Sequence, residues 1–350
     1  MGPMRIGIIG ATGYVGLELL RLLAGRAGDE VVLVTSRQEA GQKLTAFFPA
    51  LAGLANYDDL IMTEPVNLAG RADFFLMAAQ HGAAMSLVPE LLSGGARVVD
   101  LSADFRLKNP ALFEKWYSSP HTSPELLDRA VYGLPELYGD KIKDASLVAN
   151  PGCYPTSVIL ALAPAASAGL LEADQVVIVD AKSGVTGAGR TLAPGYLFVE
   201  VADNFRGYKI VGHRHTPEMI QELSLLAGFD LKLSFTPHLL PINRGILSTV
   251  YLRLKGNPSV SELREKYINF YKNSSFIRVR PEGYAPETAD VRGTNFCDLG
   301  LFYDQSCGLF KIISVIDNIC RGAGGQAIAN LNLMTGRPVE HGLILSALRP

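Results

Sequence analysis

The chain has 350 residues, of which 48% are hydrophobic and 19% charged, and its formal net charge is −2. This length and composition predict a globular protein of two domains and exclude a disordered or fibrous one. The near-neutral charge gives no sign of a nucleic-acid partner or of an anionic membrane surface. Since no secretion signal and no apolar stretch of about 18 residues is found, we expect a cytoplasmic protein with no membrane partner.

The first part of the chain alternates short apolar runs with helix-like segments. The runs expected to form strands are Arg5–Ile9, Glu30–Thr35, Asp73–Ala78, Arg97–Leu101 and Ser146–Ala149. Helices are expected at Val15–Leu23 and Met85–Leu92. Buried apolar strands that alternate with helices are typical of a parallel sheet covered on both faces, so we predict a Rossmann-type α/β domain.

A glycine-rich turn, GATGYVG at 10–16, joins the first expected strand to the first expected helix. Glycine there permits a tight turn and a close approach of backbone N–H groups to a pyrophosphate, and the helix N-terminus adds partial positive charge. The position between a strand and a helix therefore predicts a dinucleotide site. The alternative is an ordinary strand-to-helix turn.

The end of the second expected strand distinguishes NADP from NAD. An NAD enzyme usually places Asp or Glu there to bond the ribose 2′-hydroxyl. This chain has Ser36 and Arg37 instead, and its first acidic residue there is Glu39. A hydroxyl and a guanidinium suit a 2′-phosphate, so we expect NADP, used as NADPH. The alternative for Arg37 is a solvated loop arginine.

Four cysteines are present, Cys153, Cys297, Cys307 and Cys320, and their spacing matches neither a zinc site nor a CxxC motif. We therefore expect no metal, and we interpret the last three as small apolar residues. Cys153 differs, because NPGCYPT at 150–156 places it where a strand ends and a helix begins. The N–H groups of a helix N-terminus favour a thiolate, which beside a nicotinamide suits aldehyde or acyl-phosphate chemistry.

After Asn150 the pattern becomes that of an α+β domain with a mostly antiparallel or mixed sheet. Strands are expected at Gln175–Ala181, Leu231–Thr236, Gly245–Leu254 and Leu309–Ile316, and helices at about Thr156–Ala168 and Gly325–Thr335. We expect a Rossmann-type NADP-binding domain over 1–152 together with about 318–350. The catalytic and oligomerisation domain is expected over 153–317.

Two histidines stand close together in GHRHTPE at 212–218, where we expect Thr216 as a helix N-cap and Pro217 as the first helical residue. An imidazole near the thiol would stabilise the thiolate and carry a proton, so His213 and His215 are both candidates for the acid/base. The alternative is a capping loop with surface histidines.

Two further loops are candidate ligand sites. LSADFR at 101–106 follows the fourth expected strand at the carboxyl edge of the sheet, where ligands of such folds bind. Ser102 and Arg106 are its candidate substrate ligands, with Arg106 as a phosphate or carboxylate clamp; the alternative is an ion pair of Arg106 with Asp104. SGVTGAGR at 183–190 is either a flexible loop or a phosphate-contacting nest.

Taken together, these segments resemble the N-acetyl-γ-glutamyl-phosphate reductases over essentially the whole chain. The resemblance rests on GATGYVGLELLRLL (10–23), LSADFRL (101–107), YGLPE (132–136), NPGCYPT (150–156), SGVTGAGR (183–190), GHRHTPE (212–218) and DNICRGAGGQAIANLNLM (317–334). NPGCYPT together with HRHTPE is highly specific for this family. One departure is Ala79-Gln80 before His81-Gly82, where the family often reads Leu-Pro-His-Gly.

The resemblance implies NADPH-dependent reduction of N-acetyl-γ-glutamyl phosphate to the semialdehyde in arginine biosynthesis, with release of phosphate. Cys153 would carry the acyl group as a thioester, and His215 would be the acid/base. His213 would be its rival or a substrate contact, and Arg106 would hold the phosphate. The residues implied in cofactor binding are Gly10, Thr12, Gly13, Val15, Ser36, Arg37, Gly184 and Asn318. A homo-oligomer, either a dimer or a tetramer, is also implied, with a small molecule as substrate.

Three alternatives stay open. A close relative of this family acts on a carrier-bound aminoadipyl phosphate in lysine synthesis. Aspartate-semialdehyde dehydrogenase shares the architecture, and HRHTPE argues against it. The third alternative belongs to a different class, a non-catalytic NADP sensor that kept the fold.

Overall fold

The computed structural model describes residues 3–349, and the chain divides into two compact units. Unit 1 holds the residues up to Pro151 together with Ala323–Ile344. Unit 2 holds Gly152–Gly322 and the residues from Leu345 onward. Gly152, residues 318–322 and those from 345 onward, expected with the first domain, belong to unit 2.

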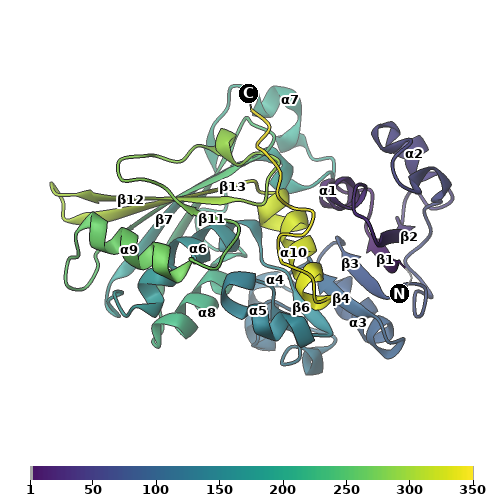
Figure 1. Ribbon diagram of the computed structural model, residues 1–350, viewed down its shortest axis with the longest axis horizontal. Coiled ribbons are helices and arrows are strands. Elements are labelled where there is room, and N and C mark those ends of the chain that lie inside the picture. Colours follow the sequence, from purple (N-terminus) through teal and green to yellow (C-terminus); the bar gives the residue numbers. More distant parts are fainter. Residues whose placement is uncertain (1–2, 350) are drawn as a thin grey trace. The chain divides into compact units, whose positions relative to one another are not determined.

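Unit 1 is built on a six-stranded parallel sheet with the strand order β2-β1-β3-β4-β6-β5 (Figure 1). Its strands are β1 (Met4–Ile9), β2 (Asp29–Thr35), β3 (Phe74–Met77), β4 (Arg97–Asp100), β5 (Val131–Tyr132) and β6 (Leu147–Ala149). Most residues of these strands are apolar and buried, as a sheet covered on both faces requires. The chain runs from β1 to β2 on one side and then to β3 on the other, and ligands of such sheets bind beside this change of direction.

Six α-helices accompany this sheet among the described residues. They are α1 (Tyr14–Leu23), α2 (Leu44–Phe47), α3 (Ala84–Ser93), α4 (Pro110–Tyr117), α5 (Pro135–Asp144) and α10 (Gly325–Met334). Short 3-10 turns lie at Pro49–Leu51, Tyr57–Asp59 and Pro124–Leu126. The last helix, α10, packs against α1 and α5. Its fully buried Asn330 donates hydrogen bonds to Gly133 O (2.9 Å) and to Asn150 Oδ1 (3.0 Å), which ties α10 to the residue that follows β6.

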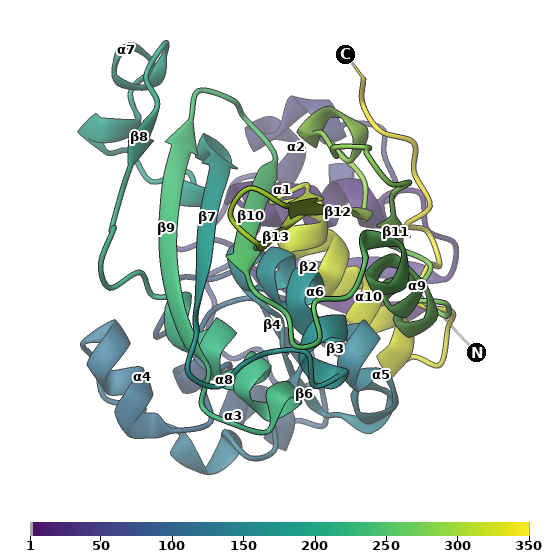
Figure 2. The same ribbon diagram turned by 90° about the vertical axis from the view of Figure 1, so that its left-hand side faces the viewer.

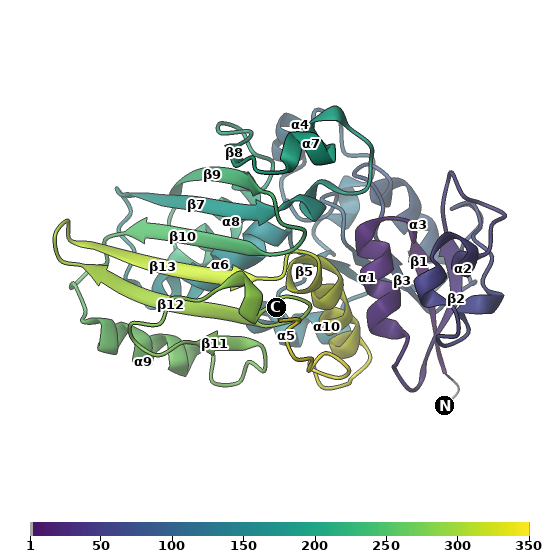
Figure 3. The ribbon, with the colours of Figure 1, turned by 90° about the horizontal axis from the view of Figure 1, so that it is seen from above.

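Unit 2 is built on a seven-stranded mixed sheet with the order β11-β12-β13-β10-β7-β9-β8, and its long strands run side by side in Figure 3. Its strands are β7 (Val176–Gly184), β8 (Arg206–Gly207), β9 (Lys232–Leu240), β10 (Ile246–Leu252), β11 (Ile277–Val279), β12 (Cys297–Asp304) and β13 (Leu309–Ile316). Pairs β11–β12 and β7–β9 are parallel, and the other neighbours are antiparallel. The Rossmann-type sheet and the mixed second sheet are both confirmed.

Helices pack on the sheet of unit 2. They are α6 (Cys153–Ser167), α8 (Thr216–Ala227) and α9 (Val260–Phe270), and a short helix, α7 (Phe198–Val201), lies between β7 and β8. Helical turns occur at Val185–Ala188, Pro194–Tyr196, Thr288–Asp290 and Cys320–Gly324. From Tyr154 to Ala166 every residue of α6 is buried, so this helix is apolar all round and forms the core of the unit.

The opposite face of this sheet is open, and we call it the open face. Residues of β7 alternate between the two faces, with Val177 and Val179 fully buried and Val176 and Ile178 exposed. Apolar side chains therefore stand exposed on a regular sheet, which in soluble proteins marks an interaction surface.

Candidate active site

The glycine turn of unit 1 fits a dinucleotide pyrophosphate. Gly10 has φ +81, and a Cβ there would lie 2.5 Å from Ala78 O. A Cβ at Gly16 would lie 2.5 Å from Ala11 O, so glycine is required at both positions. Gly13 is the N-cap of α1, and no side-chain hydrogen bond caps this helix. The first N–H groups of a helix lack intrahelical partners, so this turn offers them, with the positive end of the helix dipole, to an anion.

Ser36 joins the end of β2 to this turn. Its side chain is buried, and its Oγ lies 3.3 Å from Thr12 Oγ1. The same Oγ accepts a hydrogen bond from Glu39 N (3.2 Å), which curls the loop after β2. The next residue, Arg37, is exposed. A fixed hydroxyl beside an exposed guanidinium suits the 2′-phosphate of NADP.

The LSADFR loop follows β4 and is held by its own polar groups. Ser102 Oγ donates to Asp100 Oδ2 (2.8 Å) and accepts from Asp104 N (3.1 Å), so this hydroxyl is used inside the loop. Burial, together with the neighbouring Asp104, raises the pKa of Asp100 to about 7. Arg106 is buried, and it donates from Nε to Asn150 O (2.7 Å) and from Nη2 to Leu101 O (2.8 Å). Two carbonyls thus fix the guanidinium.

Asp104 ties this loop to the turn that precedes α3. Its carboxylate accepts hydrogen bonds from the N–H groups of Gly82 (2.8 Å), Ala84 (3.0 Å) and Met85 (3.1 Å). Asp104 therefore caps the N-terminus of α3, where a negative charge is favourable. His81 Nδ1 accepts from Ala103 N (3.0 Å). His81 and Gly82, the two residues of this segment that match the family motif, are therefore the ones bonded to the LSADFR loop.

In unit 2, Cys153 is the first residue of α6. The helix was expected from about Thr156, but it begins three residues earlier, and Pro155 is accommodated because the first N–H groups of a helix need no intrahelical partner. Cys153 forms no disulfide and is half-buried. A Cβ at Gly322 would lie 2.7 Å from Cys153 Cβ, so the turn at Cys320–Gly324 packs directly on the cysteine.

His213 and His215 lie close together at the start of α8. Their ring centroids are 4.9 Å apart, and the ring of Tyr154 lies 5.7 Å from that of His213 and 6.0 Å from that of His215. The predicted cap is off by one residue: His215 is the N-cap and Thr216 is the first helical residue. Thr216 N already donates to His213 O (2.9 Å), which starts the turn earlier.

His213 is buried and its protonation is constrained. His215 N donates to His213 Nδ1 (3.1 Å), so a neutral His213 ring carries its proton on Nε2. Burial, with Lys209 and Arg214 nearby, lowers the pKa of His213 to about 4. His213 is therefore a neutral donor near pH 7, which leaves His215 as the better candidate for the acid/base.

Sequence reasoning missed three residues of this region. Glu218 is buried on α8, and its Oε1 accepts from Gly152 N (2.8 Å), next to the cysteine. Tyr208 donates from its hydroxyl to the hydroxyl of Tyr154 (3.1 Å), and the Tyr154 hydroxyl in turn donates to His238 O (3.3 Å). Burial raises the pKa of both phenols. Glu218 stands three residues after the N-cap, the position of a capping-box acid, which was a usable signal.

The second glycine loop begins at the end of β7. A Cβ at Gly184 would lie 2.7 Å from Asn243 O, so glycine permits the close approach of two loops. The buried Asn318 accepts from Gly245 N (2.8 Å) and donates to Thr186 Oγ1 (3.1 Å). Its amide therefore holds this loop in place.

The structure places the predicted residues in two groups. Unit 1 carries Gly10, Thr12, Gly13, Val15, Ser36, Arg37, Ser102 and Arg106, and unit 2 carries Cys153, Gly184, His213, His215 and Asn318. Among residues 3–349, no group of three or more His, Cys, Asp or Glu side chains is arranged to hold a metal ion. No helix within that range has the length and apolar character needed to cross a membrane.

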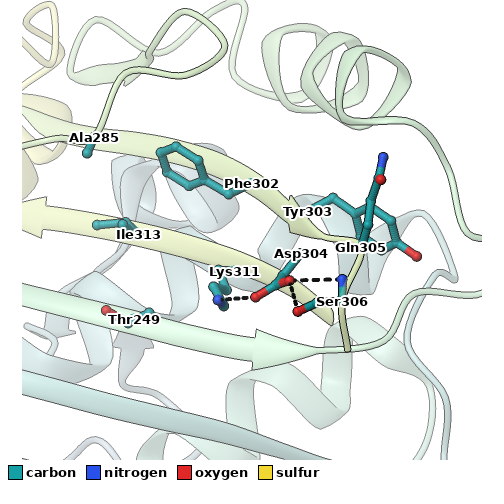
Figure 4. Close-up of a pocket in the computed structure, with 9 residues that line it drawn as sticks. All are labelled: Thr249, Ala285, Phe302, Tyr303, Asp304, Gln305, Ser306, Lys311 and Ile313. Carbon is teal, nitrogen blue, oxygen red and sulfur yellow. Dashed lines mark hydrogen bonds and ion pairs between the residues drawn. The ribbon is translucent and has the colours of Figure 1, made fainter. Parts of the chain in front are cut away.

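A cavity of about 530 Å³ lies on the open face of unit 2, near the turn between β12 and β13. Figure 4 shows Phe302, Ile313 and Thr249 along its floor, with the Asp304–Lys311 ion pair (2.6 Å) at one end. None of the predicted site residues lines it.

The chain matches two family models and several curated relatives. Residues 5–145 match the semialdehyde dehydrogenase NAD binding domain, and residues 153–318 match the semialdehyde dehydrogenase dimerisation domain. The N-acetyl-γ-glutamyl-phosphate reductase of Geotalea daltonii is 51% identical over 348 residues, covering 99% of this chain and 100% of the relative. That of Symbiobacterium thermophilum is 48% identical over 344 residues, covering 97% of each chain.

Solved structures share the fold at low identity. Aspartate semialdehyde dehydrogenase II of Vibrio cholerae has a TM-score of 0.73 at 16% identity, covering 95% of this chain and 99% of that one. The aspartate semialdehyde dehydrogenase of Candida albicans, solved with NADP, has a TM-score of 0.68 at 14% identity, with coverages of 95% and 99%. Full-length identity near one half exceeds what a shared fold requires, and the chain belongs to the N-acetyl-γ-glutamyl-phosphate reductase family, with the two domains of the semialdehyde dehydrogenases.

Proposed function

We propose that this protein reduces N-acetyl-γ-glutamyl phosphate with NADPH, giving N-acetylglutamate 5-semialdehyde and phosphate, as a step of arginine biosynthesis. The observation that carries the proposal is Cys153 at the start of α6, in the same unit as the His213–His215 pair, in a chain 51% identical to a reductase of that name. A thiol at a helix N-terminus, with an imidazole in the same unit, supplies the nucleophile and the base that acyl transfer through a thioester needs.

NADPH suits unit 1 on two grounds. The turn after β1 presents backbone N–H groups and requires glycine at Gly10 and Gly16. The loop after β2 places a hydroxyl and a guanidinium where an NAD enzyme has a carboxylate. The residues that would hold the cofactor here are Gly10, Thr12, Gly13, Val15, Ser36 and Arg37. When bound, NADPH would supply the hydride that converts a thioester to the alkoxide of a thiohemiacetal.

Cys153 acts as the nucleophile in this proposal. Its sulfur forms a bond to the acyl carbon, the C–O bond to the phosphoryl group breaks, and phosphate leaves with the bonding pair and takes a proton from solvent. His215 accepts the thiol proton as the thioester forms. After reduction the C–S bond breaks, the carbonyl reforms, and the thiolate recovers the proton from His215.

The other residues position these groups. His213, a neutral Nε2–H donor, donates a hydrogen bond to a substrate oxygen, and Glu218 fixes the Pro151–Gly152 peptide, just before Cys153, through Gly152 N. Arg106 binds the phosphoryl group, because its guanidinium is already aimed by two carbonyls and a planar fork matches phosphate. Ser102 holds the loop that carries Arg106 and so shapes the substrate site.

Two loops of unit 2 take the nicotinamide side of the cofactor in this proposal. Gly184 contributes by its close backbone approach, and Asn318 contributes by holding Thr186 and Gly245.

We infer further that the protein acts in the cytoplasm on a small molecule, as a homodimer or a homotetramer, without a nucleic-acid or membrane partner. The match of residues 153–318 to a dimerisation domain supports association, and so does the exposed apolar set on the open face. The four cysteines form no disulfide, which is usual for thiols in a reducing compartment.

The test is the reverse reaction. N-acetylglutamate semialdehyde, phosphate and NADP⁺ are supplied, and the absorbance of NADPH is followed. We expect turnover with this aldehyde, little with aspartate semialdehyde and none with Cys153→Ala. The same reaction run with NAD⁺ separates the two cofactors.

Three outcomes would contradict the proposal. Turnover that survives in Cys153→Ala removes the thioester, and a preference for aspartate semialdehyde or for an aminoadipyl substrate moves the chain to another activity. A protein that binds NADPH and turns over no aldehyde is a sensor.

A further inference from the structure

Residues 191–211 of unit 2, which we call the arm, carry a concentration of exposed apolar side chains. The arm contains the turn at Pro194–Tyr196, α7 and β8. Its exposed large apolar residues are Leu192, Tyr196, Leu197, Phe198, Val199, Phe205, Ile210 and Val211. Phe198 is 83% exposed and Val211 93% exposed, values that a side chain of an isolated soluble domain seldom reaches in a cluster.

The arm is held to its unit at a narrow place. Strand β8 pairs with β9 at two positions, Arg206 with Leu239 and Gly207 with His238. Figure 2 shows α7 and β8 standing out beyond the edge of β9, away from α6 and α8. Inside the arm, Asn204 Nδ2 donates to Glu200 O (2.9 Å). A segment with few buried apolar contacts and an exposed apolar surface is weakly ordered by its own fold and gains most from being covered.

Both ends of the arm lead into proposed site residues. It starts directly after the glycine loop that ends at Arg190, and it ends at Val211, two residues before His213. Near that end, Tyr208 N donates to Pro237 O (3.1 Å), and Tyr208 donates from its hydroxyl to Tyr154, the neighbour of Cys153. The Tyr208 ring also lies 5.6 Å from the His213 ring. The order of the arm therefore bears on the placement of the catalytic side chains.

A second copy of this chain is the occupant that fits the arm. The arm lies wholly inside the region that matches a dimerisation domain, residues 153–318. Strand β8 is the edge of the sheet whose open face exposes Val176 and Ile178, so the arm continues an apolar surface already present. The arm carries two acids, Glu200 and Asp203, and two cations, Arg206 and Lys209, so it lacks the excess of positive charge that an anionic membrane attracts.

We propose that the arm docks on a second copy of this chain, and that this contact holds Tyr208 against Tyr154 so that the active site is complete only in the oligomer. Tyr208 is thus a positioning residue, which acts through Tyr154 and His213. The activity part of this inference rests on the proposed function, whereas the docking part does not.

The test compares a charged double variant of the arm with a charged variant of another exposed apolar residue. The double variant Phe198→Asp, Val199→Asp alters the arm, and Leu225→Asp, at a residue of α8 that is 66% exposed, is the control. Sedimentation velocity gives the mass, hydrogen exchange reports on the amides of 205–215, and the reverse reaction gives kcat. We expect the arm variant to sediment as a monomer, to exchange faster at 205–215 and to lose roughly 10- to 100-fold in kcat, the scale for a misplaced catalytic group. The control keeps the wild-type mass, exchange and kcat.

The two proposals fail in different ways. If the wild type turns over no substrate, the proposed function falls while mass and exchange still test the arm. An arm variant with the mass of the wild type overturns the docking. If that variant also shows a raised KM and no other change, the arm acts instead as a lid on its own subunit. A wild-type protein that is itself monomeric overturns it too. A monomeric variant with wild-type kcat and exchange overturns the coupling to Tyr208.

Discussion

Gly322→Ala tests how closely the turn at Cys320–Gly324 fits Cys153, the proposed nucleophile. The new Cβ would lie 2.7 Å from Cys153 Cβ and 3.1 Å from Cys153 Cα. Carbon atoms in contact prefer about 3.5–4.0 Å, so one of the two segments must move by about 1 Å. Overpacking of this kind costs about 1–3 kcal/mol of stability. A nucleophile displaced by that distance loses up to about 100-fold in rate.

The assay separates displacement from unfolding. The urea midpoint gives the stability, the reverse reaction gives kcat, and thiol labelling in a Cys307→Ser background reports on Cys153, because Cys297 and Cys320 are buried. Gly25→Ala is the control, since its Cβ would meet nothing within 4 Å. We expect Gly322→Ala to lose kcat and to change its labelling rate, with the control unaffected. A Gly322→Ala protein indistinguishable from wild type in all three measurements would refute the packing described here.

Three other predictions concern unit 1. Arg37→Asp should raise the KM for NADPH sharply and leave that for the aldehyde unchanged, because it replaces the cation proposed for the 2′-phosphate; an unchanged KM for NADPH would remove that role. Asp100→Asn should stabilise the protein relative to wild type increasingly between about pH 4 and 7, by up to about 1.4 kcal/mol per pH unit. In the folded protein, burial and the neighbouring Asp104 raise the pKa of the Asp100 carboxyl to about 7, whereas the unfolded carboxyl has its ordinary pKa of 3.8. Between these two values only the folded state holds the proton, so the stability of the wild type falls as the pH rises through that window. Urea unfolding at several pH values measures this difference, and a constant difference contradicts it. Asn330→Ala should cost about 1–3 kcal/mol in urea unfolding, since it strands the buried acceptor Asn150 Oδ1, whereas Gly133 O keeps the hydrogen bond from Gln326 Nε2 (2.7 Å). A loss within error would mean that the Asn330–Asn150 bond adds nothing.

Local patterns were sufficient for most of unit 1. Apolar runs located β1, β2, β3, β4 and β6 because each is buried on both faces and bounded by turns. The two-residue strand β5 lies beside β6 and has no pattern of its own to detect.

In unit 2, helix α9 was missed, although its capping box, Ser259 with Glu262, is a start signal that can be read from the sequence.

Contacts between distant segments were beyond the sequence. NPGCYPT located Cys153 because the start of a helix is a local property, but the Glu218–Gly152 bond joins residues 66 apart and depends on how α8 packs against α6. The same holds for Tyr208, which reaches Tyr154 only because β8 pairs with β9. Strand β12 was missed because CDLGLFYD lacks the alternation expected of a half-buried strand, since both faces of its first half are buried.

The two histidines of HRHTPE are alike in sequence and differ in chemistry because of their surroundings. His213 lies between aromatic rings, close to the cations Lys209 and Arg214, and its Nδ1 is already occupied by His215 N. Every one of these features disfavours a second proton, so the ring can donate at Nε2 without ever titrating in the physiological range. A donor of fixed charge suits a carbonyl oxygen that becomes negative during reaction, whereas a group that must accept and return a proton needs a pKa near the working pH. The burial that lowers the pKa of His213 thus disfavours it as the acid/base and suits it to the proposed role of a neutral donor beside His215.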